Sequence, residues 1–297
     1  MRKFFVFLFV LTIATGAVIA ETLIEQIDRM HDEEQHQENY ALIKGAIDSA
    51  NGNVEKAELY WRLARTVLEI GDLLKQDGTD ESEILDTFSE GEGYADRSIE
   101  LNPNSHHGYY WKSANIGRWG ETKGVLNSLF KAKSMRSILS EALSINPEHA
   151  DSYYVLGIMH RKVPGRPVSF GSADKAVSLG RKAVDAQRRE FETGEAIEIK
   201  LSYFVELSRS LYERDWSASK RRKSHGDKEE SFAKERDVLK KGFFYEGTLS
   251  IPNVSDRQEA VEMIEWAISE YRSKPTLKNT ERVKFEEALA DLADWTD

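Results

Sequence analysis

One short pattern occurs twice in the chain and limits the folds open to it. In 99–103 and again in 143–147, an apolar residue, a polar residue and a second apolar residue lead into Asn-Pro. Proline cannot continue a helix, so each copy marks a helix end. An aromatic pair follows a few residues later, at 109–110 and at 153–154, where the next helix would begin. This recurrence predicts helical hairpins stacked one on another.

The second copy is close to the first helix of a tetratricopeptide repeat. Tyr153 is followed by Leu156-Gly157 and then by His160, near the aromatic-x2-Leu-Gly-x2-Tyr signature of that helix. The helix expected after it carries small residues at the positions where two antiparallel helices approach closely, namely Ala176, Gly180 and Ala183. The hairpin formed by these two helices is therefore expected to pack through Tyr153 and Ala183.

The repeat is irregular. Pro103 and Pro147 are 44 residues apart, more than the roughly 34 residues of the ideal repeat. We therefore expect inserted residues within 119–133 and a second insertion within 164–172. Gly120 is expected to end a helix, and residues 164–167 are expected to form a rigid loop at the edge of the solenoid.

The remaining sequence also indicates helices. Apolar residues from 57 to 74 follow three- and four-residue steps, an earlier helix is expected over about 23–50, and Ser82 is a candidate cap. The 19 Gly and 6 Pro among 297 residues are few for an all-β fold with many tight turns. We predict an all-α, irregular tetratricopeptide-like helical-hairpin solenoid of roughly a dozen helices. A helical bundle without repeats is the alternative.

The first twenty residues are typical of a signal peptide. Arg2 and Lys3 precede an apolar run over 4–13, and small residues at 14–20 suit cleavage after Ala20. The run is short for a membrane span, so we expect a periplasmic protein with no transmembrane span after cleavage, an uncleaved anchor being the alternative. Residues 21–297 are then expected to form one all-α domain. The repeat evidence is best in 81–190, and 191–297 either continues the solenoid or forms a separate cap.

Composition excludes several classes of function. The absence of cysteine excludes a disulfide, a thiolate metal site and an acylated lipoprotein cysteine. A net charge of −10 does not suit a nucleic-acid partner. We expect no metal, because His31 and His36 are five residues apart and do not share a helix face, and no cofactor. The basic run 220–223 is expected to be a solvated helix connection, with an anionic-lipid or partner contact as the alternative.

A solenoid of this kind presents a concave groove lined by the first helix of each hairpin. Helical spacing places Trp111, Asn115 and Arg118 on one face, and a second such face is expected on the following first helix. The candidate groove residues are Trp111, Asn115, Arg118, Trp119, Lys123, Asp151, Tyr154, Ile158 and Arg161. Aromatic and arginine side chains are typical of interaction hot spots. The alternatives are that the aromatic residues belong to the core and that Lys123 is merely solvated.

The middle of the chain, about 90–186, resembles a known family. The residues that carry the resemblance are 117–124 (Gly-Arg-Trp-Gly-Glu-Thr-Lys-Gly), 128–130, 135–147, 149–151, 163–165 and 170–172. They are similar to the tetratricopeptide T component of certain TRAP transporters, and to the related regulator of microtubule dynamics family. The resemblance implies an irregular helical solenoid that assembles as a trimer and docks a periplasmic solute-binding protein. It also implies transport of an organic-acid or hydrophobic ligand.

These observations lead to a prediction of function. We expect a non-enzymatic, exported scaffold that serves as an accessory subunit of a TRAP-type transporter. The alternatives are a helical cell-envelope enzyme that acts on glycans, and a general protein-interaction module.

Overall fold

The computed structural model describes residues 21–194 and 196–296, so the predicted signal peptide lies outside the described residues. The described residues form helices joined by short connections, with no strand among them. The elements are α1 (Leu23–Asp32), α2 (His36–Ala46), η1 (Ile47–Ser49), α3 (Gly52–Gln76), α4 (Glu81–Leu101), α5 (His106–Lys123), α6 (Val125–Ile145), α7 (Ala150–Lys162), α8 (Ala173–Glu192), α9 (Ser202–Arg214), α10 (Ala218–Lys234), α11 (Val238–Gly242), η2 (Tyr245–Thr248), α12 (Asp256–Ser273) and α13 (Asn279–Thr296).

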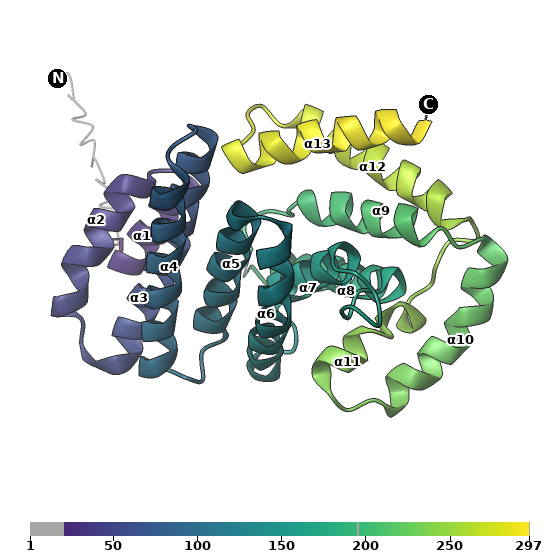
Figure 1. Cartoon of the computed structure of the whole chain (residues 1–297), viewed down its shortest axis with the longest axis horizontal. Helices are drawn as coiled ribbons and strands as arrows, with labels where there is room; N and C mark the ends of the chain where they lie inside the picture. Colours follow the sequence, from purple (N-terminus) through teal and green to yellow (C-terminus); the bar gives the residue numbers. More distant parts are fainter. Residues whose placement is uncertain (1–20, 195, 297) are drawn as a thin grey trace, which may run out of the picture.

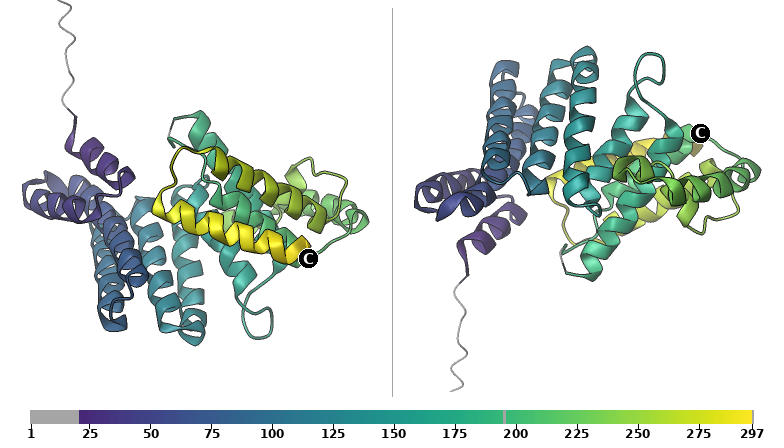
Figure 2. Two further views of the ribbon diagram at one scale, coloured as in Figure 1. Left: turned by 90° about the horizontal axis from the view of Figure 1, so that it is seen from above. Right: turned by 90° about the horizontal axis from the view of Figure 1, so that it is seen from below.

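The helices stack as antiparallel hairpins, which confirms the predicted all-α solenoid. Neighbours in sequence form the pairs α3/α4, α5/α6 and α7/α8, whereas α9 pairs with α12 because α10, α11 and η2 are inserted between them. Figure 1 shows the first hairpins side by side, with the inserted elements at the opposite end and α13 lying over α9. The views in Figure 2 show the stack turning as it proceeds from α3 to α12.

The repeat prediction is confirmed in its details. Tyr153 and Ala183 belong to one apolar core and are 2% and 1% exposed. A Cβ built on Gly157 would lie 3.5 Å from the backbone nitrogen of Gly180, so α7 and α8 approach at the small residues. The hydroxyl of Tyr153 donates to the carbonyl of Pro147, and Tyr109 makes the equivalent bond to Pro103. The two Asn-Pro segments therefore occupy equivalent places in successive hairpins.

Some predicted boundaries are wrong. The single helix expected over 23–50 is two helices, because Glu34 between them adopts a left-handed backbone with φ 57°. Asp80, not Ser82, caps α4, since the Asp80 side chain accepts from the backbone of Ser82. The residues that the sequence places as an insertion within 119–133 lie almost entirely in α5 and α6. Gly120 lies buried inside α5, and the turn comes at Gly124 with φ 103°.

The insertion at 164–172 does form a loop, as predicted, and the backbone holds it closely. The amide of Ser172 donates to the carbonyl of His160, and the amide of Gly171 donates to that of Pro164. A Cβ on Gly171 would lie 1.9 Å from the carbonyl oxygen of Val163. Only glycine fits this crossing of the chain.

Replacing Gly171 with alanine is therefore expected to destabilise the protein by about 1–3 kcal/mol, because the loop must move to admit the methyl group. Chemical unfolding of the variant would measure the change. Gly165→Ala in the same loop is the matched control, since its Cβ would meet its nearest neighbour at 3.4 Å. Equal effects of the two substitutions would contradict the steric argument.

A cluster of buried charged side chains joins the inserted elements to the solenoid. Arg214 of α9 pairs with Asp256 of α12 at 2.7 Å and with Glu246 of η2 at 2.6 Å. The other members are Asp174, Arg181, Arg221, Lys228 and Glu259. We call these eight residues the buried charge cluster. Arg221 is only 2% exposed, so the solvated connection predicted for 220–223 is wrong at this residue.

Candidate partner-binding groove

The face predicted on α5 packs inside the solenoid. Asn115 is fully buried, and its side-chain nitrogen donates to the carbonyls of Ala64 in α3 and Trp111 in its own helix. Trp111 packs with Trp119 against the apolar cluster around Phe88. These side chains therefore belong to the contact of α5 with α3 and α4. Asn115 is unavailable to a partner, and Trp111 and Trp119 match the alternative of a core role.

The cations predicted on α5 are paired within the chain. Arg118 Nε lies 3.0 Å from Asp72 of α3, and a second nitrogen of Arg118 lies 3.1 Å from Glu121. Lys123 Nζ lies 3.0 Å from Glu81 of α4. Both side chains keep more than two-fifths of their surface exposed. They remain accessible, but a partner would have to replace these ion pairs.

The face predicted on α7 lies against α9. Tyr154 stacks on Tyr203 with ring centroids 4.4 Å apart. Asp151 accepts hydrogen bonds from Tyr203 and from Lys200, whose Nζ is 2.8 Å away. Burial alone would raise the pKa of Asp151, but Lys200 and His149 hold it at about 2. Ile158 is half-buried. Asp151 and Tyr154 therefore take part in the contact of α7 with α9 and the segment before it.

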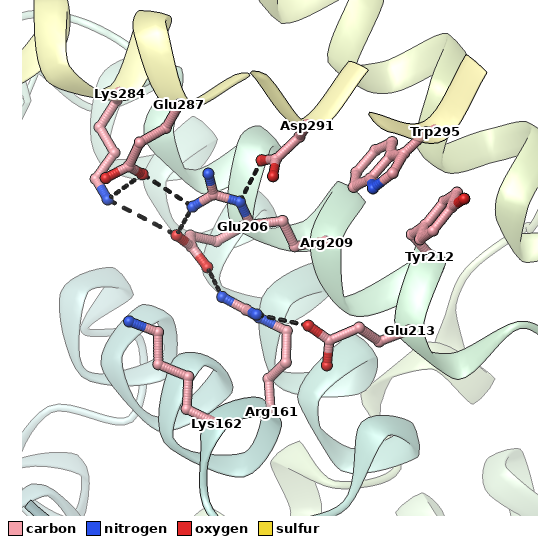
Figure 3. Close-up of a pocket in the computed structure, with 10 residues that line it drawn as sticks. All are labelled: Arg161, Lys162, Glu206, Arg209, Tyr212, Glu213, Lys284, Glu287, Asp291 and Trp295. Carbon is pink, nitrogen blue, oxygen red and sulfur yellow. Dashed lines mark hydrogen bonds and ion pairs between the residues drawn. The ribbon is translucent and has the colours of Figure 1, made fainter. Parts of the chain in front are cut away.

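Arg161 is the predicted residue that reaches a cavity. It lines a cavity of about 350 Å³ between α7, α9 and α13, drawn in Figure 3. We call this space, whose lining follows, the inner groove. Its residues are Arg161 and Lys162 of α7, Glu206, Arg209, Tyr212 and Glu213 of α9, and Lys284, Glu287, Asp291 and Trp295 of α13.

Ion pairs cross the inner groove from α7 to α9 and from α9 to α13. Arg161 lies 2.7 Å from Glu206 and 2.6 Å from Glu213. Arg209 lies 2.6 Å from Glu206, 3.0 Å from Glu287 and 2.5 Å from Asp291. Burial alone would raise the pKa of Glu206, but Arg161 and Arg209 lower it. The cations and carboxylates of the groove thus neutralise one another.

α13 covers the groove through few buried contacts. Ala288 is its only residue that is fully buried among those described. Trp295 stacks on Tyr212 with ring centroids 4.2 Å apart and planes 7° apart. At the start of α13, Asn279 bonds to Gln76 at the end of α3 and to Glu34 before α2. Partly buried apolar side chains such as Phe285 and Leu289 pack against the main core along the rest of the helix. Polar contacts, the ring stack and these apolar contacts therefore hold α13 on the solenoid.

The sequence could not identify the α9 and α13 residues of the groove. Arg209, Glu287 and Asp291 are ordinary charged positions on amphipathic helices, far apart in the chain. A carboxylate spacing of four residues in 287–291 is the one local signal, since it places both groups on one helix face.

Two further features, a metal-binding cluster and a membrane-spanning helix, are absent from the part of the chain that the structure describes. Residues 21–194 and 196–296 contain no group of three His, Asp or Glu that could hold a metal ion. No helix within those ranges is long and apolar enough to cross a membrane.

Comparison with known proteins finds relatives for the first part of the chain. Residues 23–166 match the family model described as Regulator of microtubule dynamics protein 1-3, which confirms that resemblance and extends it towards the N-terminus. Regulator of microtubule dynamics protein 1 of Bos taurus is 30% identical over 138 residues, 46% of this chain and 41% of the relative. Regulator of microtubule dynamics protein 3 of Rattus norvegicus is 20% identical over 146 residues, 48% of this chain and 30% of the relative. The chain spans less than half the length of these relatives.

One solved structure has a similar fold over most of its length. The crystal structure of a thermophilic tetratricopeptide protein from Thermus thermophilus superimposes with a TM-score of 0.53. The alignment covers 90% of this chain and 97% of that one, at 13% sequence identity. At this identity the likeness concerns the fold alone, and it supports the tetratricopeptide-like solenoid.

Proposed function

We propose that this protein is a non-enzymatic, helical-repeat scaffold that binds a helical segment of another protein in its inner groove. One observation carries the proposal: α13 already lies in that groove as a helix. Its acidic face, formed by Glu287 and Asp291, meets Arg209, and Trp295 stacks on Tyr212. Helix-in-groove binding uses anchors at such four-residue steps. The expected partner segment is an acidic amphipathic helix with an aromatic residue one or two turns further on.

Charge reversal on α13 tests this proposal in the full chain. Glu287→Lys combined with Asp291→Lys brings cations next to Arg209 and is expected to release α13 from the groove. A synthetic peptide of residues 279–296 should then bind the variant more tightly than the wild type, whose own helix competes at high effective concentration. Isothermal titration calorimetry measures both affinities.

Two control variants make the result specific. Glu286→Lys combined with Asp294→Lys changes the charge of α13 equally at exposed positions without ion pairs, and should bind no better than the wild type. Adding Arg209→Glu to the releasing variant, Glu287→Lys with Asp291→Lys, should abolish the gain in peptide affinity. The proposal fails if the releasing variant binds no more peptide than the exposed-position control.

We further propose a specific partner. The support is the resemblance of 117–124 and its neighbours to T components of TRAP transporters, together with the apolar leader at 1–20. The protein is then exported to the periplasm, assembles as a trimer and docks a solute-binding protein that carries an organic-acid or hydrophobic ligand. Purified solute-binding protein from such a transporter should co-elute with the mature chain. Failure to associate at micromolar concentrations would count against this partner and would leave the groove proposal standing.

A second candidate, a helical cell-envelope enzyme that acts on glycans, is favoured by one carboxyl group. Burial and the neighbouring Asp72 raise the pKa of Glu69 on α3 to about 7, which suits a general acid. Glu69→Gln should then abolish release of soluble fragments from purified cell-wall glycan, whereas exposed Glu83→Gln should not. Absence of any such release by the wild-type protein would exclude this candidate.

A further inference from the structure

A second cavity lies beneath the loop that joins α7 to α8. It has a volume of about 510 Å³ and shares no lining residue with the inner groove. Two cations on α6, Lys133 and Arg136, line it together with Arg166, Ser169 and Phe170 of the loop. We call it the loop pocket.

Within the described part of the chain, the cations that line the loop pocket have no ion-pair partner. Among the described residues, no carboxylate lies within ion-pair distance of Lys133, Arg136 or Arg166, although the chain has 51 acidic residues and only 41 basic ones. In the inner groove, by contrast, Arg161 and Arg209 each have two or more carboxylate partners. Burial lowers the pKa of the neighbouring Lys175, Arg136 and Arg166 lower it further, and Asp174 only partly opposes them.

The wall of the pocket contains a hydrogen-bonding group without a partner. Ser169 is 9% exposed, and its Oγ is buried with no hydrogen-bond partner. A buried hydroxyl left unpaired is costly, so structures normally satisfy it with protein, water or ligand. Here the unpaired hydroxyl belongs to a residue that lines a pocket with unpaired cations.

Arg136 is held in place by a ring contact, and the backbone that carries Arg166 is ordered by hydrogen bonds. The Arg136 guanidinium lies 4.5 Å from the centre of the Phe170 ring, which fixes its plane and leaves its edge N–H groups free to donate. Arg166 sits in a turn closed by the amides of Val168 and Ser169, both of which donate to the carbonyl of Gly165. The rigid crossing at Gly171 secures the base of this turn.

We propose that the loop pocket binds an oxyanion, the phosphate group of a small molecule or of a lipid headgroup. Arg136 and Arg166 donate charge-assisted hydrogen bonds to its oxygens, Lys133 adds a further positive charge at the rim, and the Ser169 hydroxyl donates from the wall. This site is independent of the partner-binding role of the inner groove.

Binding of inorganic pyrophosphate to the full chain, followed by calorimetry at low ionic strength, tests the proposal. Arg136→Gln combined with Arg166→Gln should weaken binding by about tenfold or more, since each removes a charge-assisted bond. Ser169→Ala should weaken it by a few-fold while leaving the unfolding temperature unchanged or higher. Lys223→Gln combined with Lys240→Gln removes the same charge from exposed positions outside the pocket and should leave binding unchanged.

A second probe distinguishes the two sources of phosphate. Sedimentation with phosphatidylglycerol vesicles, and with phosphatidylcholine vesicles as reference, reports on a lipid headgroup. Binding to either pyrophosphate or phosphatidylglycerol that is lost in the double arginine variant supports the site. If that variant does not fold, Lys133→Gln combined with Ser169→Ala takes its place. Absence of binding to both probes, or equal loss in the Lys223/Lys240 control, would overturn the proposal.

Discussion

Arg214→Ala is expected to destabilise the protein by about 3–5 kcal/mol, the cost of removing one partner from a buried ion pair. Arg214 is 7% exposed and bonds to Asp256, which is fully buried, and to Glu246, which is 3% exposed. Burial alone would raise the pKa of Glu246, but Arg214 and Arg181 hold it well below its usual range. Without Arg214, Asp256 keeps only Arg221 among the described cations, and Glu246 keeps Arg181 and Lys228. Both carboxylates then remain buried with one cation fewer.

Guanidinium unfolding of the wild type and the variant measures this effect as a shift in midpoint. Lys234→Ala is the control, because its pair with Glu230 is about two-thirds exposed and such pairs contribute about 0–1 kcal/mol. A shift for Arg214→Ala no larger than that of the control would mean that the buried charge cluster does not join α9 to α12 and η2 as described.

Lowering the pH from 7 to 5 is expected to destabilise the protein by at least about 2 kcal/mol. Burial lowers the pKa of His149 to about 3, against the opposing charge of Asp151. Burial also lowers the pKa of His160 to about 3, and Lys175 and Arg136 add to that effect. Both residues are buried, at 7% and 1% exposure. In the unfolded chain a histidine has a pKa of about 6.5. As the pH falls from 7 to 5, these histidines therefore become protonated in the unfolded state but stay neutral in the native state.

The sign follows from linkage. A depressed histidine pKa contributes stability that is present above pH 6.5 and declines as the pH falls towards the folded value. For each histidine ring, the free energy of unfolding falls by up to about 2 kcal/mol between pH 7 and pH 5. Glu69 has the opposite effect, because its pKa is raised in the folded protein. Its contribution to the free energy of unfolding grows as the pH falls from about 7 towards 4.5, and this gain offsets the loss caused by about one histidine ring.

Urea unfolding at a series of pH values measures this dependence. His160→Phe removes one titrating ring from a site lined by Phe170 and Phe243, and should flatten the slope between pH 6 and 5 by about one proton. A variant with the same slope as the wild type would show that His160 binds its proton equally in both states.

The sequence predicts much of the fold because hairpin signals are local. The Asn-Pro segments, the aromatic residues that follow them and the small residues at Gly157 and Gly180 each act within a few turns of helix. The groove was harder to predict for a physical reason. Helical periodicity shows that Asp151 and Tyr154 share a face, but it cannot tell whether that face meets a partner or the neighbouring hairpin. Here it meets α9.

Long-range charge pairing escaped prediction altogether. Arg181 and Glu259 are 78 residues apart, and Arg209 and Asp291 are 82 apart. Each looks like a solvated surface charge when its own helix is read alone, as the basic run containing Arg221 did. These residues become structural only because α8, α9, α10, α12 and α13 meet in three dimensions.

The contacts of Asn279 have a mechanical consequence for the whole molecule. A stack of hairpins can deform elastically along its length, because each unit touches only its neighbours and small rotations add up along the stack. Asn279, the first residue of α13, bonds to Gln76 and Glu34, and Lys278 beside it lies 3.6 Å from Asp32. The last helix is therefore connected directly to the N-terminal end of the curved stack. While these contacts are present, they limit changes in the curvature of the stack. A partner that displaces α13 would break these contacts and allow the stack to extend. Binding at the C-terminal end would then change the arrangement of the N-terminal helices.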